Sequence, residues 1–539
     1  MHRMVDSLRH GRLAGWLLAC LLALAAGLAR AEPAGLDALA VLAGDDSNAK
    51  LQVIGQLGGL PDPRAAAVLR ALGEDRLYTT DDGHVLIVAD GQAQDPVTGA
   101  RQALPAGAQP IAINNRLRRA IEGAQAASAL HAGDSAARLQ AARRLQQSND
   151  ASRLPLIEQA LRQESNADVR AALELAQAKL ELASPDATVR LHAVQLLGKA
   201  ADPAFRPLLA ALAAEGGDAD TGVREAAATA LRGIDRHMAT MEWAGNLFYG
   251  LSLGSVLLLA ALGLAITFGL MGVINMAHGE LLMIGAYATY LVQTFFRAWL
   301  PGWLDWYVLA ALPVAFLIAA LVGMALERTV IRWLYGRPLE TLLATWGISL
   351  ILMQAVRSLF GAQNVEVSNP GWMSGGITVL GGLVLTYNRI VIIVFALLVV
   401  FLVWLLLNHT RLGLFVRAIT QNRRMADCVG VPTGRVDMLA FGLGSGIAGL
   451  AGVALSQLGN VGPDLGRGYI VDSFMVVVLG GVGQLAGTVI AALGLGGVNK
   501  FLEPYAGAVM AKITILVLIV LFVQKRPQGL FAPRGRSAE

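Results

Sequence analysis

Residues 266–287 read ITFGLMGVINMAHGELLMIGAY, a run in which polar groups interrupt an otherwise apolar stretch. Asn275, His278 and Glu280 lie within it, where hydrocarbon would be expected on either side. An ionisable side chain costs free energy in hydrocarbon unless it faces protein or a water-filled path, so such residues mark candidate functional sites. The run therefore predicts a membrane protein and suggests that it moves something across the bilayer.

The composition supports a membrane protein. Of 539 residues, 55% are hydrophobic and 15% are charged, and the mean hydropathy is +0.54. Soluble domains carry about 25% charged residues, so much of this chain is expected in lipid. The formal net charge of +4 is modest. The two cysteines, Cys20 and Cys428, lie on segments that should not meet, so no disulfide framework is expected.

The N-terminus has the parts of an export signal. A start with three arginines precedes an apolar stretch over residues 13–28, and a small-residue site follows at Ala31. We expect residues 1–31 to form a signal peptide cleaved after Ala31. An uncleaved first membrane helix is the alternative, but the apolar stretch is short for a span. Cys20 is followed by more apolar residues, which argues against a lipoprotein cleavage site.

Residues 32–240 are rich in alanine and contain no run long enough to cross a bilayer. This predicts an exported, mainly helical domain. A small β-hairpin is expected over residues 77–88, where an Asp-Gly turn separates β-prone runs. A V-R-x-x-A core recurs at Val169, Val189 and Val223, each time opening a predicted helix. This pattern resembles HEAT-like helical repeats, with ordinary alanine-rich helices as the alternative.

The membrane domain is expected over residues 241–531. A span needs about 20 apolar residues, and the 470–482 segment is short enough to be a half-helix or re-entrant segment. The predicted fold is therefore an all-α, polytopic membrane protein of about nine spans. The candidate spans are Asn246–Phe268, Val273–Val292, Trp306–Leu326, Leu339–Phe360, Ile390–Leu407, Val436–Leu458, Ile470–Val482, Leu485–Leu502 and Gly507–Val523.

The orientation follows from the basic loops. Lysine and arginine concentrate in residues 327–337, 409–435 and 525–536, which are expected in the cytoplasm. Counting back places the N-terminal domain outside, and residues 532–539 form a cytoplasmic tail. The glycine-rich loop 362–388 is then external; it either receives a soluble partner or serves as a plain connector.

The polar run offers the first candidate site. On a helix, Asn275 and His278 would share a face, and Gly279 would allow a close approach of backbones. These residues and Glu280 either line a translocation path or form a buried packing network. Residues two positions apart on a helix do not face one another, so a metal or catalytic pair is poorly supported. Asp472, at the outer start of a short span, either faces the path or caps the helix, and a cap is favoured.

The second candidate site is the basic loop over residues 417–432. It is too polar to span, and its pattern predicts a short amphipathic helix ended by a turn. Such a helix can dock into a groove on a cytoplasmic partner, whereas an ordinary solvated basic loop is the alternative. The candidate residues are Arg417, Arg423, Arg424, Ala426, Gly430 and Pro432.

Residues 444–449 fit the dinucleotide-binding pattern G-x-G-x-x-G. They lie inside an apolar span with no preceding strand, so close helix packing through Gly442, Gly446 and Gly449 is the better interpretation.

Four segments together resemble the permeases of ABC importers of the branched-chain amino-acid type. They are residues 263–280, 417–432, 469–483 and 526–531. The long exported domain departs from the amino-acid permeases and is similar to the urea-transport branch. The resemblance implies that the 417–432 loop is the coupling helix that meets an ATPase. Arg424 and Met425 depart from the Glu and Ala usual in such loops.

The resemblance implies a transport subunit of the bacterial inner membrane, without catalytic or metal-binding residues. The sequence lacks a G-x-x-x-x-G-K-[ST] motif, so two cytoplasmic ATPase subunits are expected to use the ATP, and no cofactor is expected on this chain. A homologous second permease subunit, a periplasmic solute-binding protein and membrane lipid are the other expected partners; nucleic acid is not. Urea is the expected solute, with branched-chain amino acids or short amides as alternatives. Two other classes are an ATP-independent channel and a membrane-anchored scaffold.

Overall fold

The computed structural model describes residues 36–531, apart from residues 61, 81, 90, 106, 148, 380 and 381. The expected signal peptide, with Cys20, and the expected tail at 532–539 lie outside the described residues. The chain divides into two compact units, the first ending at His237 and the second beginning at Met238. Each unit is described separately.

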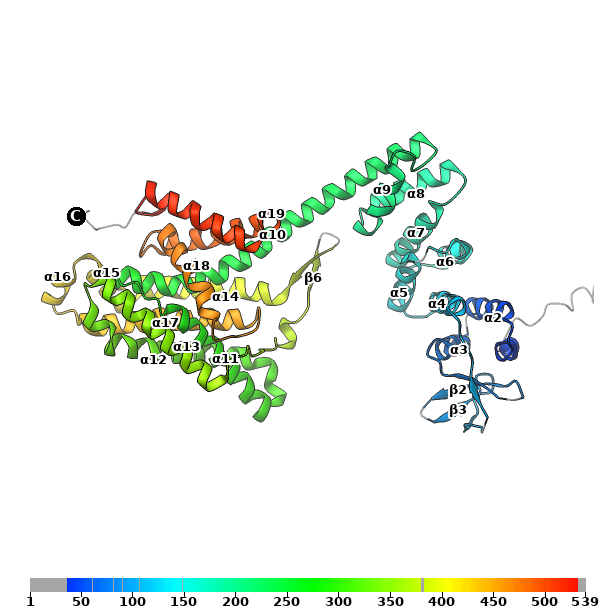
Figure 1. Ribbon diagram of the computed structural model, residues 1–539, viewed down its shortest axis with the longest axis horizontal. Helices are drawn as coiled ribbons and strands as arrows, with labels where there is room; N and C mark the ends of the chain where they lie inside the picture. Colours follow the sequence, from blue (N-terminus) through cyan, green and yellow to red (C-terminus); the bar gives the residue numbers. More distant parts are fainter. Residues whose placement is uncertain are drawn as a thin grey trace, which may run out of the picture. The chain divides into compact units, whose positions relative to one another are not determined.

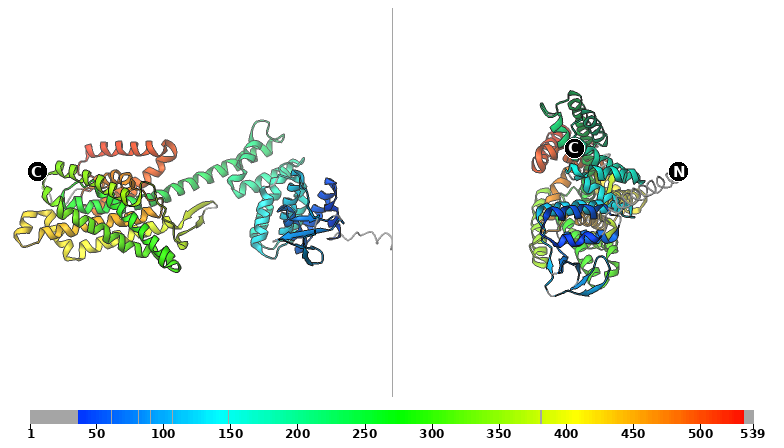
Figure 2. Two further views of the ribbon diagram at one scale, coloured as in Figure 1. Left: turned by 60° about the horizontal axis from the view of Figure 1, so that its bottom comes forward. Right: turned by 90° about the vertical axis from the view of Figure 1, so that its right-hand side faces the viewer.

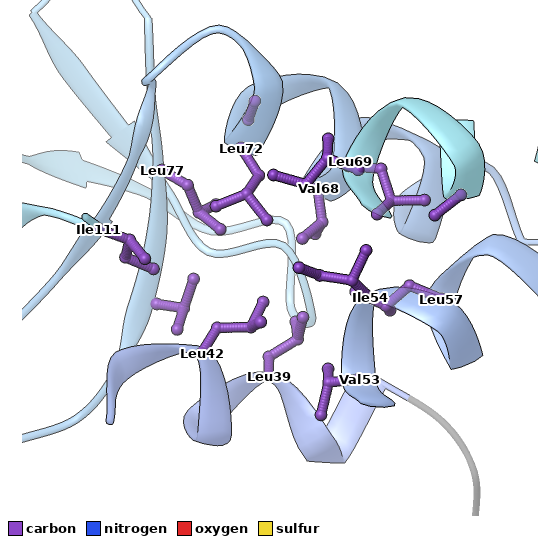
Figure 3. Packing of buried hydrophobic residues seen from close by; sticks show 14 of the residues in the cluster. Leu39, Leu42, Val53, Ile54, Leu57, Val68, Leu69, Leu72, Leu77 and Ile111 are labelled. Atoms are coloured by element: carbon purple, nitrogen blue, oxygen red, sulfur yellow. The ribbon is translucent and has the colours of Figure 1, made fainter. Parts of the chain in front are cut away.

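The first unit begins with a small helical core. It is built by η1 (Leu36–Ala43), α2 (Ser47–Gly59), α3 (Pro63–Gly73) and α4 (Asn115–Ala129). Leucine and isoleucine side chains from all four helices meet in its centre, among them Ile121 of α4. Figure 3 shows Leu42, Ile54 and Leu69 of this core. Asp46 and Asp62 cap α2 and α3 by accepting backbone N–H bonds in the first turn.

An antiparallel sheet packs on this core. Its strands are β1 (Leu77–Thr79), β2 (Val85–Ala89), β3 (Gln92–Gln94), β4 (Arg101–Ala103) and β5 (Gln109–Pro110), in the order β4-β3-β2-β1-β5. The predicted hairpin is confirmed as β1–β2, with Tyr78 opposite Leu86. The sheet is larger than predicted because β3 to β5 are two or three residues long and mostly exposed, so they carry no apolar alternation.

A helical array follows in the first unit. It contains α5 (Ser135–Gln147), η2 (Ala151–Arg153), α6 (Leu154–Gln163), α7 (Ala167–Glu181), α8 (Ala187–Ala200), η3 (Pro203–Phe205), α9 (Arg206–Ala213) and the start of α10 (Thr221–Met271). The three predicted V-R-x-x-A cores do open helices, namely α7, α8 and α10 (Figure 1). The spacing of these cores is irregular because α8 follows α7 directly, whereas α9 separates α8 from α10.

The arginine of each core reaches back over the preceding turn. Arg190 donates to the carbonyl oxygens of Ser184 and Pro185, at 2.9 and 3.0 Å, and pairs with both carboxylate oxygens of Asp218. The main-chain carbonyl of Asp218 in turn accepts from Arg224. Arg138, Glu164 and Arg170 repeat the arrangement one step earlier. These bonds fix the angle at which successive helices enter the array.

The second unit is a helical bundle (Figures 1 and 2). After α10 come α11 (His278–Trp299), η4 (Pro301–Trp306), α12 (Tyr307–Thr329), η5 (Ile331–Leu334), α13 (Pro338–Phe360), η6 (Gly371–Met373), β6 (Gly376–Val379), β7 (Leu383–Thr386), α14 (Tyr387–His409), α15 (Arg411–Gln421), α16 (Arg423–Cys428), α17 (Thr433–Ser456), α18 (Leu465–Gly480) and α19 (Leu485–Lys525). Within the described part of the chain, α10, α12, α13, α14, α17 and α19 are long and apolar enough to cross a membrane.

These helices confirm the predicted all-α, polytopic fold. Every predicted span overlaps a helix, and α19 holds the last two, with non-helical backbone at Gly507 between them. The predicted start at Val273 was wrong, because α11 begins only at His278. The short segment predicted at 470–482 is the 16-residue helix α18.

Helix α17 lies at the centre of the bundle, in contact with α10, α11 and α12. Its glycines allow this: a Cβ atom added at Gly442, Gly446 or Gly449 would come within 2.7 Å of α12. At Gly444 it would lie 2.6 Å from the carbonyl oxygen of Gly263 on α10. The G-x-G-x-x-G pattern is therefore a packing surface inside one continuous helix, as predicted.

The predicted external loop is folded. It contains η6 and the β6–β7 hairpin, and Asp305 fixes it to the turn between α11 and α12. The Asp305 carboxylate accepts the N–H of Gly371, and the main-chain carbonyl oxygen of Asp305 accepts the indole N–H of Trp372, both at 2.7 Å.

Candidate functional site

The polar run sits at a break between two helices. Helix α10 ends at Met271, Gly272 takes a left-handed conformation (φ +65°), and α11 starts at His278. Asn275 therefore does not share a helix face with His278, which corrects the prediction. Its side-chain oxygen instead accepts the N–H of Ala277 at 3.0 Å, just before the helix. An asparagine that bonds to nearby backbone in this way favours a turn over a continued helix.

His278 ties α11 to α10. The ring is fully buried, and Nε2 lies 2.9 Å from the carbonyl oxygen of Ala260. A Cβ atom at Gly263 would lie 2.9 Å from the ring, so the imidazole fills the space that this glycine leaves. These contacts give His278 a packing role in this arrangement.

Gly279 brings α11 against α18. A Cβ atom at Gly279 would lie 2.7 Å from the carbonyl oxygen of Gly466, and one at Gly466 would lie 2.2 Å from that of Gly279. The two backbones are in direct contact, as the sequence predicted for Gly279.

Glu280 faces α13. The residue is 2% exposed, and its Oε1 accepts the hydroxyl of Ser349 at 2.9 Å. Its second oxygen, Oε2, is buried and has no partner among the described residues. A buried carboxylate with a single hydroxyl donor is an unusual arrangement, because buried charges are normally paired.

Helix α13 carries a row of buried hydroxyl groups, two of which bond α11 or the segment just before it. Thr341, Thr345 and Ser349 follow one another at four-residue spacing and are all buried. Thr345 accepts the N–H of Met276 at 3.2 Å, and Ser349 bonds Glu280. Sequence reasoning missed this row, although hydroxyl residues at i, i+4 and i+8 in an apolar span were a readable signal.

Further along, the rings of Tyr287 and Phe360 lie 4.7 Å apart between centroids. The hydroxyl of Tyr287 and the Nε of Arg357 are buried without a partner in the described structure. The other end of the Arg357 guanidinium binds the carboxylate of Asp464 at 2.9 and 3.0 Å.

We name this region the α11–α13 seam, defined by Met276, Glu280 and Tyr287 on one side and by Thr345, Ser349 and Phe360 on the other. The contacts Met276–Thr345, Glu280–Ser349 and Tyr287–Phe360 follow in the same order along both segments. Helices α11 and α13 therefore run in the same direction. The seam holds two buried polar atoms without a hydrogen-bond partner among the described residues, Glu280 Oε2 and the Tyr287 hydroxyl. A polar solute or water is the chemistry that such atoms accommodate.

Asp472 does not cap a helix, which corrects the favoured prediction. It is the eighth residue of α18 and accepts a hydrogen bond from Lys512 of α19 at 3.0 Å. Its side chain is 15% exposed and that of Lys512 52%. The pair joins α18 to α19 and lies apart from the polar contacts of the seam.

The predicted coupling loop forms two short helices, α15 and α16. Asn422 separates the two helices, and its side-chain oxygen caps α16 by accepting the N–H of Met425 at 3.0 Å. A turn follows α16, with Gly430 in the left-handed region (φ +85°) and Pro432 directly before α17. The predicted short helix ended by a turn is thus present, although it starts at Arg423 and Arg417 lies on α15.

The loop residues divide into inward and outward groups. Ala426 is buried in a small cluster with Leu270 at the end of α10 and Val436 of α17. Arg417 bonds the carbonyl oxygen of Leu407 at 2.8 Å. Arg424, Met425 and Val429 instead point to solvent, and Met425 and Val429 are 61% and 73% exposed.

Arg423 connects α16 to the polar run. It pairs with the fully buried carboxylate of Asp437, and its guanidinium lies 4.9 Å over the ring of Tyr335. The Tyr335 hydroxyl lies 2.9 Å from Glu327 Oε1 and 3.2 Å from the sulfur of Met271. Since Met271 is the last residue of α10, contacts run unbroken from α16 to the helix break that carries Asn275.

Comparison with known proteins agrees with this architecture. Residues 246–523 match the family described as "Branched-chain amino acid transport system / permease component". Over 291 residues the chain is 30% identical to the high-affinity branched-chain amino acid transport system permease protein BraD of Pseudomonas aeruginosa, which covers 53% of this chain and 94% of that protein. The corresponding protein LivH of Escherichia coli is 30% identical over 292 residues, with the same coverage. The ribose import permease protein RbsC of Escherichia coli is 31% identical over 134 residues, covering 23% of this chain and 42% of that protein.

Proposed function

Because the chain belongs to the family of permease components of branched-chain amino acid transport systems, we propose that it is the permease subunit of an ATP-driven importer of a small polar solute, namely urea. The observation that carries the proposal is the continuous set of contacts from the exposed face of α16 to the α11–α13 seam. One end is suited to a protein partner and the other to a polar solute.

The seam is the proposed translocation element. Glu280 Oε2 and the Tyr287 hydroxyl offer hydrogen-bonding atoms without a partner among the described side chains. Such groups cost free energy in hydrocarbon unless a solute, water or protein meets them. A passing amide group offers both donors and acceptors to the carboxylate and the hydroxyls.

The proposed coupling element is α16. Met425 on α16 and Val429 directly after it expose apolar surface, and Ala426 and Arg423 anchor the helix to the rest of the unit. An exposed apolar face on a fixed short helix fits the helix-in-groove mode of recognition. Closure of two ATPase subunits would push on α16, and Tyr335 and Met271 would carry the displacement to the break before α11.

The proposed assembly contains a second, homologous permease subunit, two cytoplasmic ATPase subunits and a periplasmic solute-binding protein. ATP is then used by the partner subunits, and this chain acts as a transport subunit in the bacterial inner membrane. The first unit and the 362–388 loop lie in the periplasm, and the α15–α16 loop and the C-terminus lie in the cytoplasm. The basic residues of that loop support this orientation.

Two observations bear on the solute. The BraD relative aligns over 94% of its own length to 53% of this chain, so most of the first unit has no counterpart in it. This added unit supports a branch other than the amino-acid permeases, and it is the reason why we propose urea as the solute. The names of BraD and LivH favour branched-chain amino acids as the second candidate.

The solute assignment is tested by uptake of radiolabelled urea and leucine in cells with and without the gene. We expect urea uptake to disappear with the gene and leucine uptake to remain. Loss of leucine uptake with urea uptake intact would reject urea and support the second candidate.

The coupling role is tested with Val429→Asp, because this side chain is exposed and its replacement leaves the contacts of the loop intact. We expect uptake to fall at least about tenfold while the chain remains in the membrane, since a buried unpaired charge weakens an apolar contact by this order. Leu414→Asp on α15 is the matched control, because Leu414 is also exposed (57%) and does not belong to the apolar surface formed by Met425 and Val429. Normal uptake in the Val429→Asp variant would reject the docking role of α16.

A further inference from the structure

The first unit contains a cleft that the transport function does not use. Its volume is about 860 Å³, and α3, α4, α5 and the turn before α5 line it. Ligand pockets for small molecules commonly measure about 300–1,000 Å³. The cleft therefore has the size of a small-molecule site.

The cleft lies where two hydrophobic cores meet. Leu117, Ile121 and Ala124 of α4 belong to the core with α2 and α3, whereas Ala126 of the same helix, with Leu130 directly after it, belongs to the core with α5, α6 and α7. Helix α4 is thus shared by both cores, and the cleft has one wall from each. Binding sites occur preferentially at such junctions.

Each of the three helices contributes one arginine to the cleft. Arg70 comes from α3, Arg118 from α4 and Arg144 from α5, and His131 lies in the turn between α4 and α5. No acidic side chain in the described structure forms an ion pair with any of these arginines. Three guanidinium groups consequently face one cleft without a fixed counter-charge.

The acidic residues of the lining do not neutralise these arginines. Asp62 is bonded to Arg64, and Glu74 is bonded to Arg76, and neither of these two partners lines the cleft. Glu122 is the remaining lining carboxylate. The cleft therefore has an excess of positive charge, and Ile121 with neighbouring alanines gives it a partly apolar wall.

We propose that this cleft binds a small molecule that carries two or more carboxylate or phosphate groups. Guanidinium groups form bidentate, charge-assisted hydrogen bonds with both kinds of anion. Arginines from three helices can hold two anionic groups at once, which a single helix could not do. The concave shape favours a small ligand over the flat face of an acidic protein.

The test is isothermal titration of the full chain in nanodiscs of neutral lipid with phosphate, pyrophosphate, succinate and citrate. We expect saturable binding of at least one divalent or trivalent probe, weakened by added salt because the contacts are partly exposed. The pattern across the panel separates phosphate from carboxylate recognition. The readout is independent of transport, so its failure is distinct from failure of the proposed function.

Arg70→Gln, Arg118→Gln and Arg144→Gln should each weaken binding by about tenfold or more, as expected for loss of a charge-assisted contact. Arg143→Gln is the matched control, because Arg143 is the neighbouring exposed arginine of α5 and does not line the cleft. Absence of saturable binding for the whole panel, or equal weakening by Arg143→Gln, would overturn the proposal. Binding of polyglutamate without binding of the small probes would place an acidic protein segment there and would overturn it as well.

Discussion

Two buried carboxylates of the first unit, Asp218 and Glu164, are paired with arginine, whereas Glu280 of the second unit is not. In the first unit, Asp218 and Glu164 are each 8% exposed, and both oxygens of each carboxylate bind an arginine. In the second unit, Glu280 is 2% exposed and has one hydroxyl partner, Ser349. In the first arrangement the arginine offsets the desolvation free energy of the buried carboxylate. In the second arrangement a single hydroxyl offsets only part of it. The contrast separates a structural carboxylate from a candidate functional one.

The largest expected effect comes from removing a carboxylate that is paired with an arginine. Asp218→Asn should lower the free energy of opening of α8 by about 3 kcal/mol, because Arg190, whose side chain is 11% exposed, loses its counter-charge. The matched control is Asp235→Asn. Its pair with Arg206 has the same 2.7 Å length, but the side chains are 45% and 48% exposed, so a change below about 1 kcal/mol is expected.

Hydrogen–deuterium exchange in the full chain measures both changes, through the α8 amides for Asp218→Asn and the α9 amides for Asp235→Asn. Equal effects of the two variants would contradict a structural role that depends on burial.

The opening free energy of α8 should also depend on pH through the Asp218–Arg190 pair, with a smaller effect. Hydrogen bonds from the Arg190 side chain, followed by the N–H of Asp220, lower the pKa of Asp218 from 3.8 to about 2. The carboxylate therefore contributes its full stability above about pH 4 and loses it as the pH falls toward 2. The loss should amount to about 2 kcal/mol in the opening free energy of α8.

Exchange measured between pH 5 and pH 2 checks this, with Asp218→Asn as the reference that should lack this step. The same step in the Asp218→Asn variant would assign it to another group.

The smallest expected effect concerns Glu280, the carboxylate of the second unit that has no arginine partner. Glu280→Gln keeps an oxygen for Ser349 but removes the charge. Uptake should fall by about tenfold, the size expected when one hydrogen bond to a charged group is lost. Thermal stability should not fall, because Glu280 has no charged partner among the described residues.

Glu340→Gln at the start of α13 is the control, since Glu340 is exposed and pairs with an exposed Arg337. Lower thermal stability with unchanged uptake in Glu280→Gln would make Glu280 a structural residue like Asp218.

Local sequence signals predicted much of the fold. Apolar runs located the spans, the Asp-Gly turn located β1–β2, and glycine and proline after Cys428 located the turn that ends α16. The break before α11 was missed because Val273 and Ile274 extend the apolar run, and only the left-handed Gly272 and the Asn275 bond show that the chain turns.

The candidate site was only half predicted, because its second half comes from far along the chain. Glu280 was found through its charge, whereas its partner Ser349 is one hydroxyl in an apolar helix. The roles of Arg417 and Arg423 as anchors, and of Asp472 as a partner of Lys512, depend on contacts between separate helices. Residue type and spacing within one segment do not contain such contacts.

The central claim is that this chain couples solute uptake to ATP used by partner subunits. The most direct measurement is the initial rate of radiolabelled urea uptake in cells that carry the wild-type chain, before and after depletion of ATP. The account predicts that uptake stops on depletion and returns when ATP is restored. Uptake that continues without ATP would contradict it and would identify the chain as an ATP-independent channel.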